Sequence, residues 1–154
     1  MQKIYKSIQV LLLSTLSFNL YAAGDAKHFP GIFLGATHAE SDTNFTYGIE
    51  YEYKFTPQWG VGAVYEDTAD GHDGDGVEIK LGALYYHPKS YLRVGLGIGE
   101  EKIGGKKPKT KDVVRLSINY DYHFGDYAIA PLVAVDFIDG EEAWVVGVAF
   151  VRPF

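Results

Sequence analysis

Charged side chains recur at every second position in several parts of the chain, and they are the residues best able to do chemistry. The clearest case is the stretch Asn44 to Phe55, where Glu50, Glu52 and Lys54 alternate with aromatic and aliphatic residues. A period of two is that of a β-strand with two unlike faces. Such a face could pair its charges across a closed interior, or conduct protons or ions through an open one, depending on the elements that position it.

A second group of chemical interest is the Asp/Gly-rich stretch 68–76, in which Asp70, Asp73 and Asp75 surround His72. Oxygen ligands at alternate positions suit a hard cation such as calcium. No glutamate stands at the closing position of an EF-hand loop, so a solvated acidic loop is the favoured interpretation. We expect no metal site and no cofactor.

Three residues of the types used in nucleophilic catalysis, His38, Ser41 and Asp42, lie together in a polar stretch. A hydroxyl, a base and an acid can form a catalytic triad. Small polar residues also gather easily in a surface loop, and nothing else in the chain extends the pattern. The sequence therefore favours a protein that is not an enzyme.

Composition narrows the protein class further. The chain has 154 residues, enough for one domain, and no cysteine, which excludes disulfides, thiolate metal sites and a lipidated N-terminal cysteine. Glycine and tyrosine are abundant, at 18 and 12 residues. High aromatic content at a mean hydropathy of -0.08 fits alternating strands and not a bundle of membrane helices.

The first residues have the features of a secretory signal peptide. Lys3 and Lys6 precede an apolar run from Ile8 to Leu20, and small residues follow it. We assign residues 1–23 to the signal, with cleavage within 22–26. Its removal leaves 12 basic and 20 acidic residues, a net charge of -8. That balance argues against nucleic-acid binding, which needs a basic surface.

The rest of the chain, residues 28–154, contains eight stretches with strand periodicity and no expected helix. They are Phe29–His38, Asn44–Phe55, Trp59–Asp67, Val77–Tyr86, Leu92 to Gly99, Asp112–Phe124, Tyr127–Phe137 and Glu142–Phe154. Connections are expected to alternate between short turns and longer loops, with long loops at 68–76 and 100–111. Short and long connections alternate in this way in membrane β-barrels. Pro131 should produce a local bulge in the seventh strand.

Aromatic residues gather near both ends of these strands, as expected where a barrel meets the two membrane interfaces. Those expected at the short-turn end are Tyr53, Phe55, Trp59, Tyr85, Tyr91, Tyr122, Phe124, Tyr127 and Phe154, and those at the other end are Phe45, Tyr65, Phe137 and Trp144.

Together, the signal peptide, the eight alternating strands and the C-terminal stretch Val146 to Phe154 resemble the small outer-membrane β-barrels of the OmpA/OmpX type. The resemblance implies a closed eight-stranded antiparallel up-and-down transmembrane β-barrel in the bacterial outer membrane. Phe150 and Phe154 are similar to the C-terminal signal read by the barrel assembly machinery, although Arg152 stands where an apolar or aromatic residue is usual. The expected surroundings are outer-membrane lipid and lipopolysaccharide, and the expected state is a monomer.

An eight-stranded barrel has an interior just wide enough for side chains to fill. Inward-facing charges should therefore pair as a plug, because unpaired buried charge is costly. The residues assigned to this plug are Glu50, Glu52, Lys54, Glu66, Glu78, Lys80, Arg93, Arg115, Asp121 and Asp136, with His123 also expected inside.

These features predict a non-catalytic barrel with a structural or surface-contact role. One alternative is a narrow channel or small-ligand carrier that uses the space beside Gly95, Gly97 and Gly99. Others are a lipid-A-modifying enzyme and a soluble barrel of the lipocalin type. The stretch 100–111 is rich in lysine and, if it faces the cell exterior, could contact lipopolysaccharide phosphates.

Overall fold

The computed structural model describes residues 26–72 and 74–154. The predicted signal segment 1–23 lies outside the described residues. The strands are β1 (His28–Ala39), β2 (Asp42–Lys54), β3 (Trp59–His72), β4 (Asp75–Lys89), β5 (Leu92–Ile103), β6 (Lys109–Tyr120), β7 (Tyr122–Phe124), β8 (Tyr127–Ile138) and β9 (Glu141–Val151). Within the described part of the chain, no helix is long and apolar enough to span a membrane.

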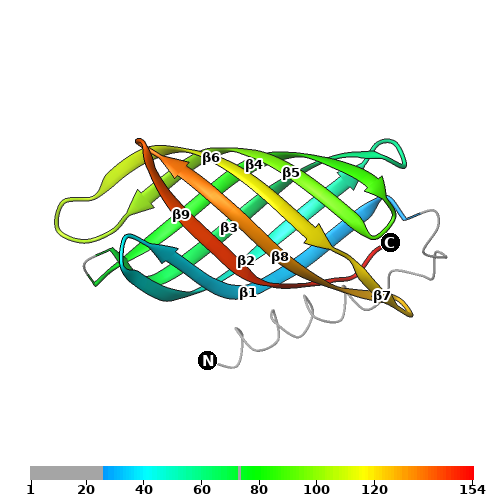
Figure 1. The fold of residues 1–154 in the computed structure, drawn as a ribbon, viewed down its shortest axis with the longest axis horizontal. Coiled ribbons are helices and arrows are strands. Elements are labelled where there is room, and N and C mark those ends of the chain that lie inside the picture. Colours follow the sequence, from blue (N-terminus) through cyan, green and yellow to red (C-terminus); the bar gives the residue numbers. More distant parts are fainter. Residues whose placement is uncertain (1–25, 73) are drawn as a thin grey trace, which may run out of the picture.

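The strands form one antiparallel sheet that closes on itself (Figure 1). Strands that follow each other in the chain are paired, except that β6 pairs with β8 in place of β7, and β1 also pairs with β9. Strands β6 and β7 pair with β8 in one continuous register, from Asn119↔Leu132 to Tyr122↔Ile129, so they occupy a single position in the barrel. The predicted closed eight-stranded up-and-down barrel is confirmed.

The interruption between β6 and β7 has a simple cause. The register of these two strands against β8 places Tyr120 opposite Pro131, and proline has no backbone N–H to donate. Strand β8 itself runs through Pro131 without a break. The predicted bulge in the strand that contains Pro131 is therefore wrong, since the irregularity lies in the neighbouring strand.

The long connections predicted at 68–76 and 100–111 are mostly strand. Strand β3 continues to His72, and β4 begins at Asp75. Strand β5 continues to Ile103, and β6 already begins at Lys109. Together they form a ribbon that projects beyond the other strands (Figure 1). Apart from the buried Ile103, these segments carry mainly polar residues and glycine, so their periodicity is hidden in the sequence.

We call the end of the barrel that carries this ribbon the loop end. The opposite end is the terminal end, where the Lys27 N–H donates to the Phe154 carbonyl at 3.1 Å.

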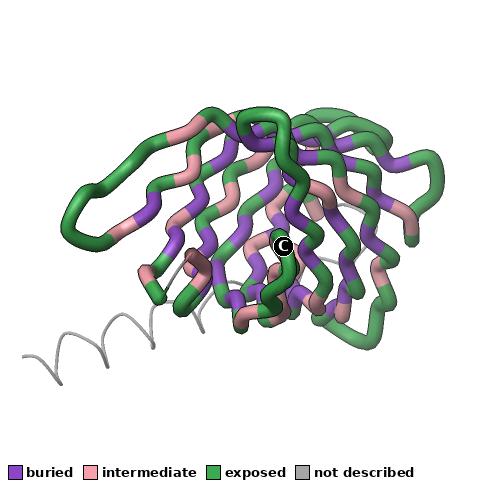
Figure 2. The backbone as a smooth tube through the Cα atoms, turned by 60° about the vertical axis from the view of Figure 1, so that its left-hand side comes forward, coloured by how far each residue is buried: buried purple, intermediate pink, exposed green. Residues whose placement is uncertain are grey.

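Exposed and buried residues alternate along the strands, as Figure 2 shows. The outward residues are large and apolar, and Ile32, Ile49 and Ile98 are 58%, 61% and 65% exposed. An outer wall of this kind suits lipid, because water disfavours so much contiguous apolar surface. The predicted aromatic residues lie on this wall except Tyr85, which is buried, and its place is taken by Tyr86 with its ring 4.8 Å from that of Trp59.

Strand β4 has the opposite orientation to the one predicted. Val77, Ile79 and Leu81 face the interior, whereas the side chains of Glu78 and Lys80 face outward, at 39% and 52% exposure. Their assignment to the luminal plug is therefore wrong. The prediction assumed that the apolar face of each strand meets lipid, but the interior near the loop end is itself apolar.

Candidate functional site

The barrel interior collects most of the charged residues that the sequence placed there. Strand β2 contributes Glu50 and Glu52, and β3, β5, β6 and β8 contribute one residue each, because alternation points every second side chain inward. The exposed fractions are 7% for Glu50, 1% for Glu52, 3% for Glu66, 3% for Arg93, 4% for Arg115 and 0% for Asp136. Charges buried this deeply need partners.

The first set of partners, the Arg93 cluster, comprises Arg93, Glu50, Glu52 and His87. Arg93 Nη2 donates to Glu50 Oε1 at 2.8 Å, and Nη1 donates to Glu52 Oε2 at 3.2 Å. The other oxygen of Glu52 accepts from His87 Nε2 at 2.6 Å. The Arg93 guanidinium also lies 4.9 Å from the centre of the Tyr85 ring. Both carboxylates therefore have a cationic or hydrogen-bonding partner.

The second set, the Arg115 cluster, comprises Arg115, Glu66 and Asp136. Arg115 Nε and Nη2 donate to the two oxygens of Asp136 at 2.6 and 2.7 Å. Nη1 and Nη2 donate to the two oxygens of Glu66, each at 2.7 Å. One guanidinium thus binds two carboxylates in fork-like geometry, which is the strongest form of this interaction. The cluster links β3, β6 and β8 across the lumen.

Two of the remaining predicted plug residues lie at the terminal end of the lumen, and two face the outer wall. The Lys54 ammonium sits 4.4 Å from the centre of the Phe29 ring near the terminal end. Asp121 is half-buried at the break between β6 and β7. His123 is directly opposite the buried Ala128, so it lies on the predicted inward face, and it is exposed because it is at the terminal end. Glu78 faces the outer wall, as does Lys80.

His87 and Asn119 are interior residues that sequence reasoning missed. His87 is 3% exposed and Asn119, directly across from Arg93, is 1% exposed. His87 falls in a stretch that reads as a turn, and its position is clear only once β4 is oriented with Tyr85 inside. Asn119 stands on the polar face of a strand whose inward direction was correctly predicted, so its alternation with Arg115 is the signal that could have found it.

The space beside the interior glycines of β5 is filled by side chains. A Cβ atom at Gly95 would lie 2.9 Å from the Tyr85 ring, and the same ring would lie 2.8 Å from a Cβ at Gly62 on β3. A Cβ at Gly97 would meet Leu81 and Arg115 at 3.3 and 3.4 Å. The glycines therefore make room for Tyr85 and Leu81 and do not leave a passage.

Apolar side chains complete the filling of the lumen. One group, the upper apolar layer, lies toward the loop end and consists of Val77, Ile79, Leu81, Ile103, Val113 and Ile138. A second group toward the terminal end includes Phe29, Ala130 and Val151. The charged clusters are thus embedded among apolar residues, which limits the water available to an ion.

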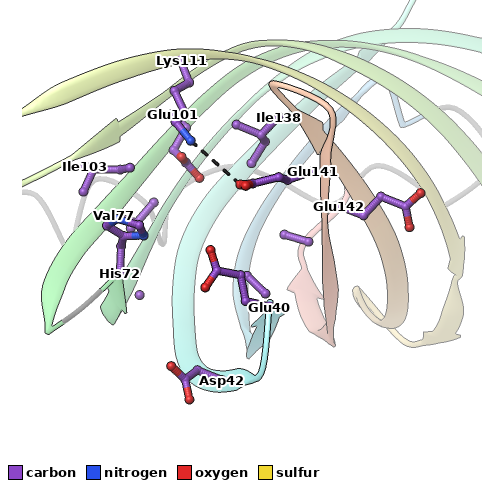
Figure 3. A pocket seen from close by; sticks show the side chains of 13 residues that line it. Glu40, Asp42, His72, Val77, Glu101, Ile103, Lys111, Ile138, Glu141 and Glu142 are labelled. Carbon is purple, nitrogen blue, oxygen red and sulfur yellow. Dashed lines mark ion pairs between the residues drawn. The ribbon is translucent and has the colours of Figure 1, made fainter.

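A small cup remains at the loop end above the upper apolar layer (Figure 3). Its volume is about 80 Å³, and its rim carries Glu101, Lys111 and Glu141. The Lys111 ammonium lies 4.0 Å from Glu141. At ~30 Å³ per water molecule, the cup has room for two or three waters.

The other candidates from the sequence form no recognisable centre in the described residues. No group of three or more His, Asp or Glu side chains in residues 26–72 and 74–154 is placed to hold a metal ion. His38 Nδ1 is hydrogen-bonded to Thr43 Oγ1 at 2.8 Å, across the β1–β2 turn that contains Ser41.

Comparisons with known proteins place the fold. No protein-family model and no curated protein sequence matches the chain. Among solved structures, the N-terminal β-barrel domain of Pseudomonas aeruginosa OprF matches with a TM-score of 0.66 and 14% identity, over 84% of this chain and all of that one. Neisserial surface protein A matches with a TM-score of 0.62 and 8% identity, over 82% and 96%. Yersinia pestis Ail, in a bilayer nanodisc, matches with a TM-score of 0.58 and 14% identity, over 81% and 99%.

These matches confirm the resemblance to small outer-membrane barrels of the OmpA/OmpX type. A closed barrel whose outer wall is apolar and whose interior is filled needs a bilayer around it. The chain therefore has the fold of the small outer-membrane β-barrels.

Proposed function

We propose that the protein is a non-catalytic, non-conducting barrel that anchors surface-exposed segments in the outer membrane. The observation that carries this proposal is the filled lumen, in which the Arg93 and Arg115 clusters and the upper apolar layer close the interior at successive levels. The cup above them is too small to carry a solute. Function is therefore assigned to the parts of the chain outside the membrane.

The closed lumen makes a direct prediction about ion conduction. Wild-type protein reconstituted in planar bilayers is expected to show no single-channel steps, because an ion would have to separate buried charge pairs and cross an apolar layer. Insertion is verified beforehand by the heat-dependent gel shift of a folded barrel. Discrete steps in the wild type that change in Arg115→Glu would overturn the closed interior and support a narrow channel.

The surface segment with the strongest chemical character is the β5–β6 ribbon. It carries Lys102, Lys106, Lys107, Lys109 and Lys111 around the turn between Ile103 and Lys109. Three of these lysines, at 106, 107 and 109, are exposed and lie at or beside the tip. Both described termini lie at the opposite end, so the ribbon is assigned to the cell exterior, where lipopolysaccharide phosphates are the nearest polyanion.

Removing charge from the ribbon tip is expected to weaken contact with lipopolysaccharide. The triple variant Lys106→Gln, Lys107→Gln, Lys109→Gln should lower the affinity of the folded barrel for lipopolysaccharide about tenfold at low salt, with a smaller loss at higher salt. Binding is measured by titrating the labelled barrel, held in neutral nanodiscs, with lipopolysaccharide.

The matched control is Lys89→Gln, which removes an exposed lysine beside a turn at the terminal end. It should bind lipopolysaccharide as the wild type does. Equal affinities for the wild type and the triple variant would contradict a role of the ribbon in this contact, and would leave the closed barrel itself unaffected.

A further inference from the structure

Because Glu78 and Lys80 face outward, the apolar part of the outer wall is shorter on β4 than on β2. On β2 the outward apolar residues run from Phe55 to Phe45, ten positions, or about 25 Å of height at ~3.3 Å per residue and a tilt of ~40°. On β4 the outward apolar residues run from Tyr86 only to Gly82, and Lys80 follows at a height of about 15 Å above Tyr86. The apolar band of such barrels is ~25 Å tall, so this wall places charges at a depth that lipid disfavours.

These charges form an ordered arrangement on adjacent strands. Lys80 is directly opposite Glu100, and Glu78 is directly opposite Lys102. Lys80 Nζ lies 3.7 Å from Glu78 and 5.9 Å from the centre of the Tyr65 ring. Asp112 is directly opposite Glu100 on the next strand, so three carboxylates lie around Lys80 and Lys102, and the patch is poorly suited to an anionic lipid headgroup.

Below the charges, the wall is hollowed. A depression of about 670 Å³ is lined by outward residues that include Tyr51, Ala63, Tyr65 and Gly82, with Lys80 and Glu100 at its upper edge. Ala63 and Gly82 are directly opposite each other on β3 and β4. A Cβ atom at Gly82 would meet no atom within 4 Å. Small residues allow two membrane proteins to approach closely.

We propose that two copies of the chain form a dimer in the membrane through this surface. It consists of Ala63 and Tyr65 on β3, Lys80 and Gly82 on β4, and Ile98 and Glu100 on β5. A two-fold axis normal to the membrane keeps both ribbons on the same side and brings the same surface of each copy together. When the axis passes between Lys80 and Glu100, Lys80 of each copy faces Glu100 of the other. Lys80 and Glu100 then each face an opposite charge on the other copy, in addition to the Lys80–Glu78 pair within each copy.

The same axis also brings apolar residues of the two copies into contact. The rows of paired residues climb toward the loop end from β3 to β6 because the strands are tilted. A line from the Lys80–Glu100 pair toward the terminal end therefore passes close to Gly82 and then Ala63. Tyr65 and Ile98 flank this line on opposite sides, so the two-fold rotation brings Tyr65 of one copy against Ile98 of the other. Ile98, at 65% exposure, is among the most prominent side chains on the wall.

This inference concerns the assembly state and goes beyond the proposed anchoring role. It departs from the monomer expected from the sequence, and the reason is specific. The sequence assigned Glu78 and Lys80 to the lumen, which left Val77, Ile79 and Leu81 to extend the apolar outer face of that strand.

Single cysteines give the decisive test, because the chain has none of its own. Ala63→Cys lies near the proposed axis, and the control Val133→Cys is an outward, 43% exposed position on β8. Mild oxidation of outer membranes from cells making each variant should yield about tenfold more disulfide-linked dimer for Ala63→Cys than for Val133→Cys, because only the first thiol is held near its copy. Equal yields, or Ala63→Cys remaining monomeric as it would if lipid alone filled the hollow, would overturn the dimer.

Charge reversal in the Ala63→Cys background tests the pairing itself. Lys80→Glu alone and Glu100→Lys alone should each reduce the dimer yield severalfold, and the double variant should restore it, because the exchange preserves opposite signs across the axis. The heat-dependent gel shift identifies the folded fraction, to which each yield is normalised. Unchanged yields in both single variants, or no recovery in the double variant, would overturn the Lys80–Glu100 contact between copies.

Discussion

Replacing Arg115 by methionine is expected to lower the free energy of unfolding of the barrel by about 3–5 kcal/mol. The substitution removes a guanidinium that donates to all four oxygens of Glu66 and Asp136, both of which are almost completely buried. Two carboxylates would then face each other in an apolar interior without a cation. Urea unfolding in phospholipid vesicles, followed by tryptophan fluorescence and the gel shift, measures the loss.

Two comparisons show whether the loss comes from unpaired charge. Lys109→Met removes an exposed lysine from the ribbon and should change the unfolding free energy by no more than about 0.5 kcal/mol. Adding Glu66→Gln and Asp136→Asn to Arg115→Met removes both orphaned charges and should recover a large part of the loss. A loss below about 1 kcal/mol in Arg115→Met, the size of a surface ion pair, would contradict the assignment of the cluster as a buried structural plug.

The strands themselves were predictable because their outer faces have a strict period of two. Phe45 to Phe55 is the clearest case: its aromatic face lies outside and its charged face inside, as the sequence predicted. Strand β4 shows where this reasoning fails. It carries apolar residues on one face along its whole length and tyrosines on both, Tyr85 inside and Tyr86 outside, so periodicity locates the strand but cannot say which face meets lipid.

Correct orientation of β4 depends on contacts between strands distant in sequence. Val77 and Ile79 are buried because Ile103, Val113 and Ile138 from three other strands pack with them. Likewise, the partners of Arg93 and Arg115 are set by the sheet register and barrel closure, which place β2, β3 and β8 around the two arginines. The sequence of a single strand does not show which residues of other strands will pack against it.

The C-terminal Phe154 leads to the second large expected effect. Phe154→Ala is expected to reduce the amount of barrel in the outer membrane about tenfold, through loss of the residue proposed to be read by the barrel assembly machinery. Phe154 also has a place in the folded barrel. Its ring stacks on His28 at 5.2 Å, and its N–H donates to the His28 carbonyl at 2.9 Å. An aromatic pair of this kind is worth about 0.5–1.5 kcal/mol, far too little to empty the membrane by destabilisation alone.

His28→Ala separates the two roles, because it removes the same ring stacking and leaves the C-terminus intact. It also removes the hydrogen bond between His28 Nδ1 and the Tyr51 hydroxyl, 2.7 Å long, so its structural cost should equal or exceed that of Phe154→Ala. Quantitative immunoblots of outer-membrane fractions should therefore show near-normal levels for His28→Ala and a severe loss for Phe154→Ala, while both proteins refold into vesicles with similar stability. Equal levels of the two variants in cells would show that Phe154 matters only for the seam between β1 and the C-terminus, and that the machinery recognises another part of the chain.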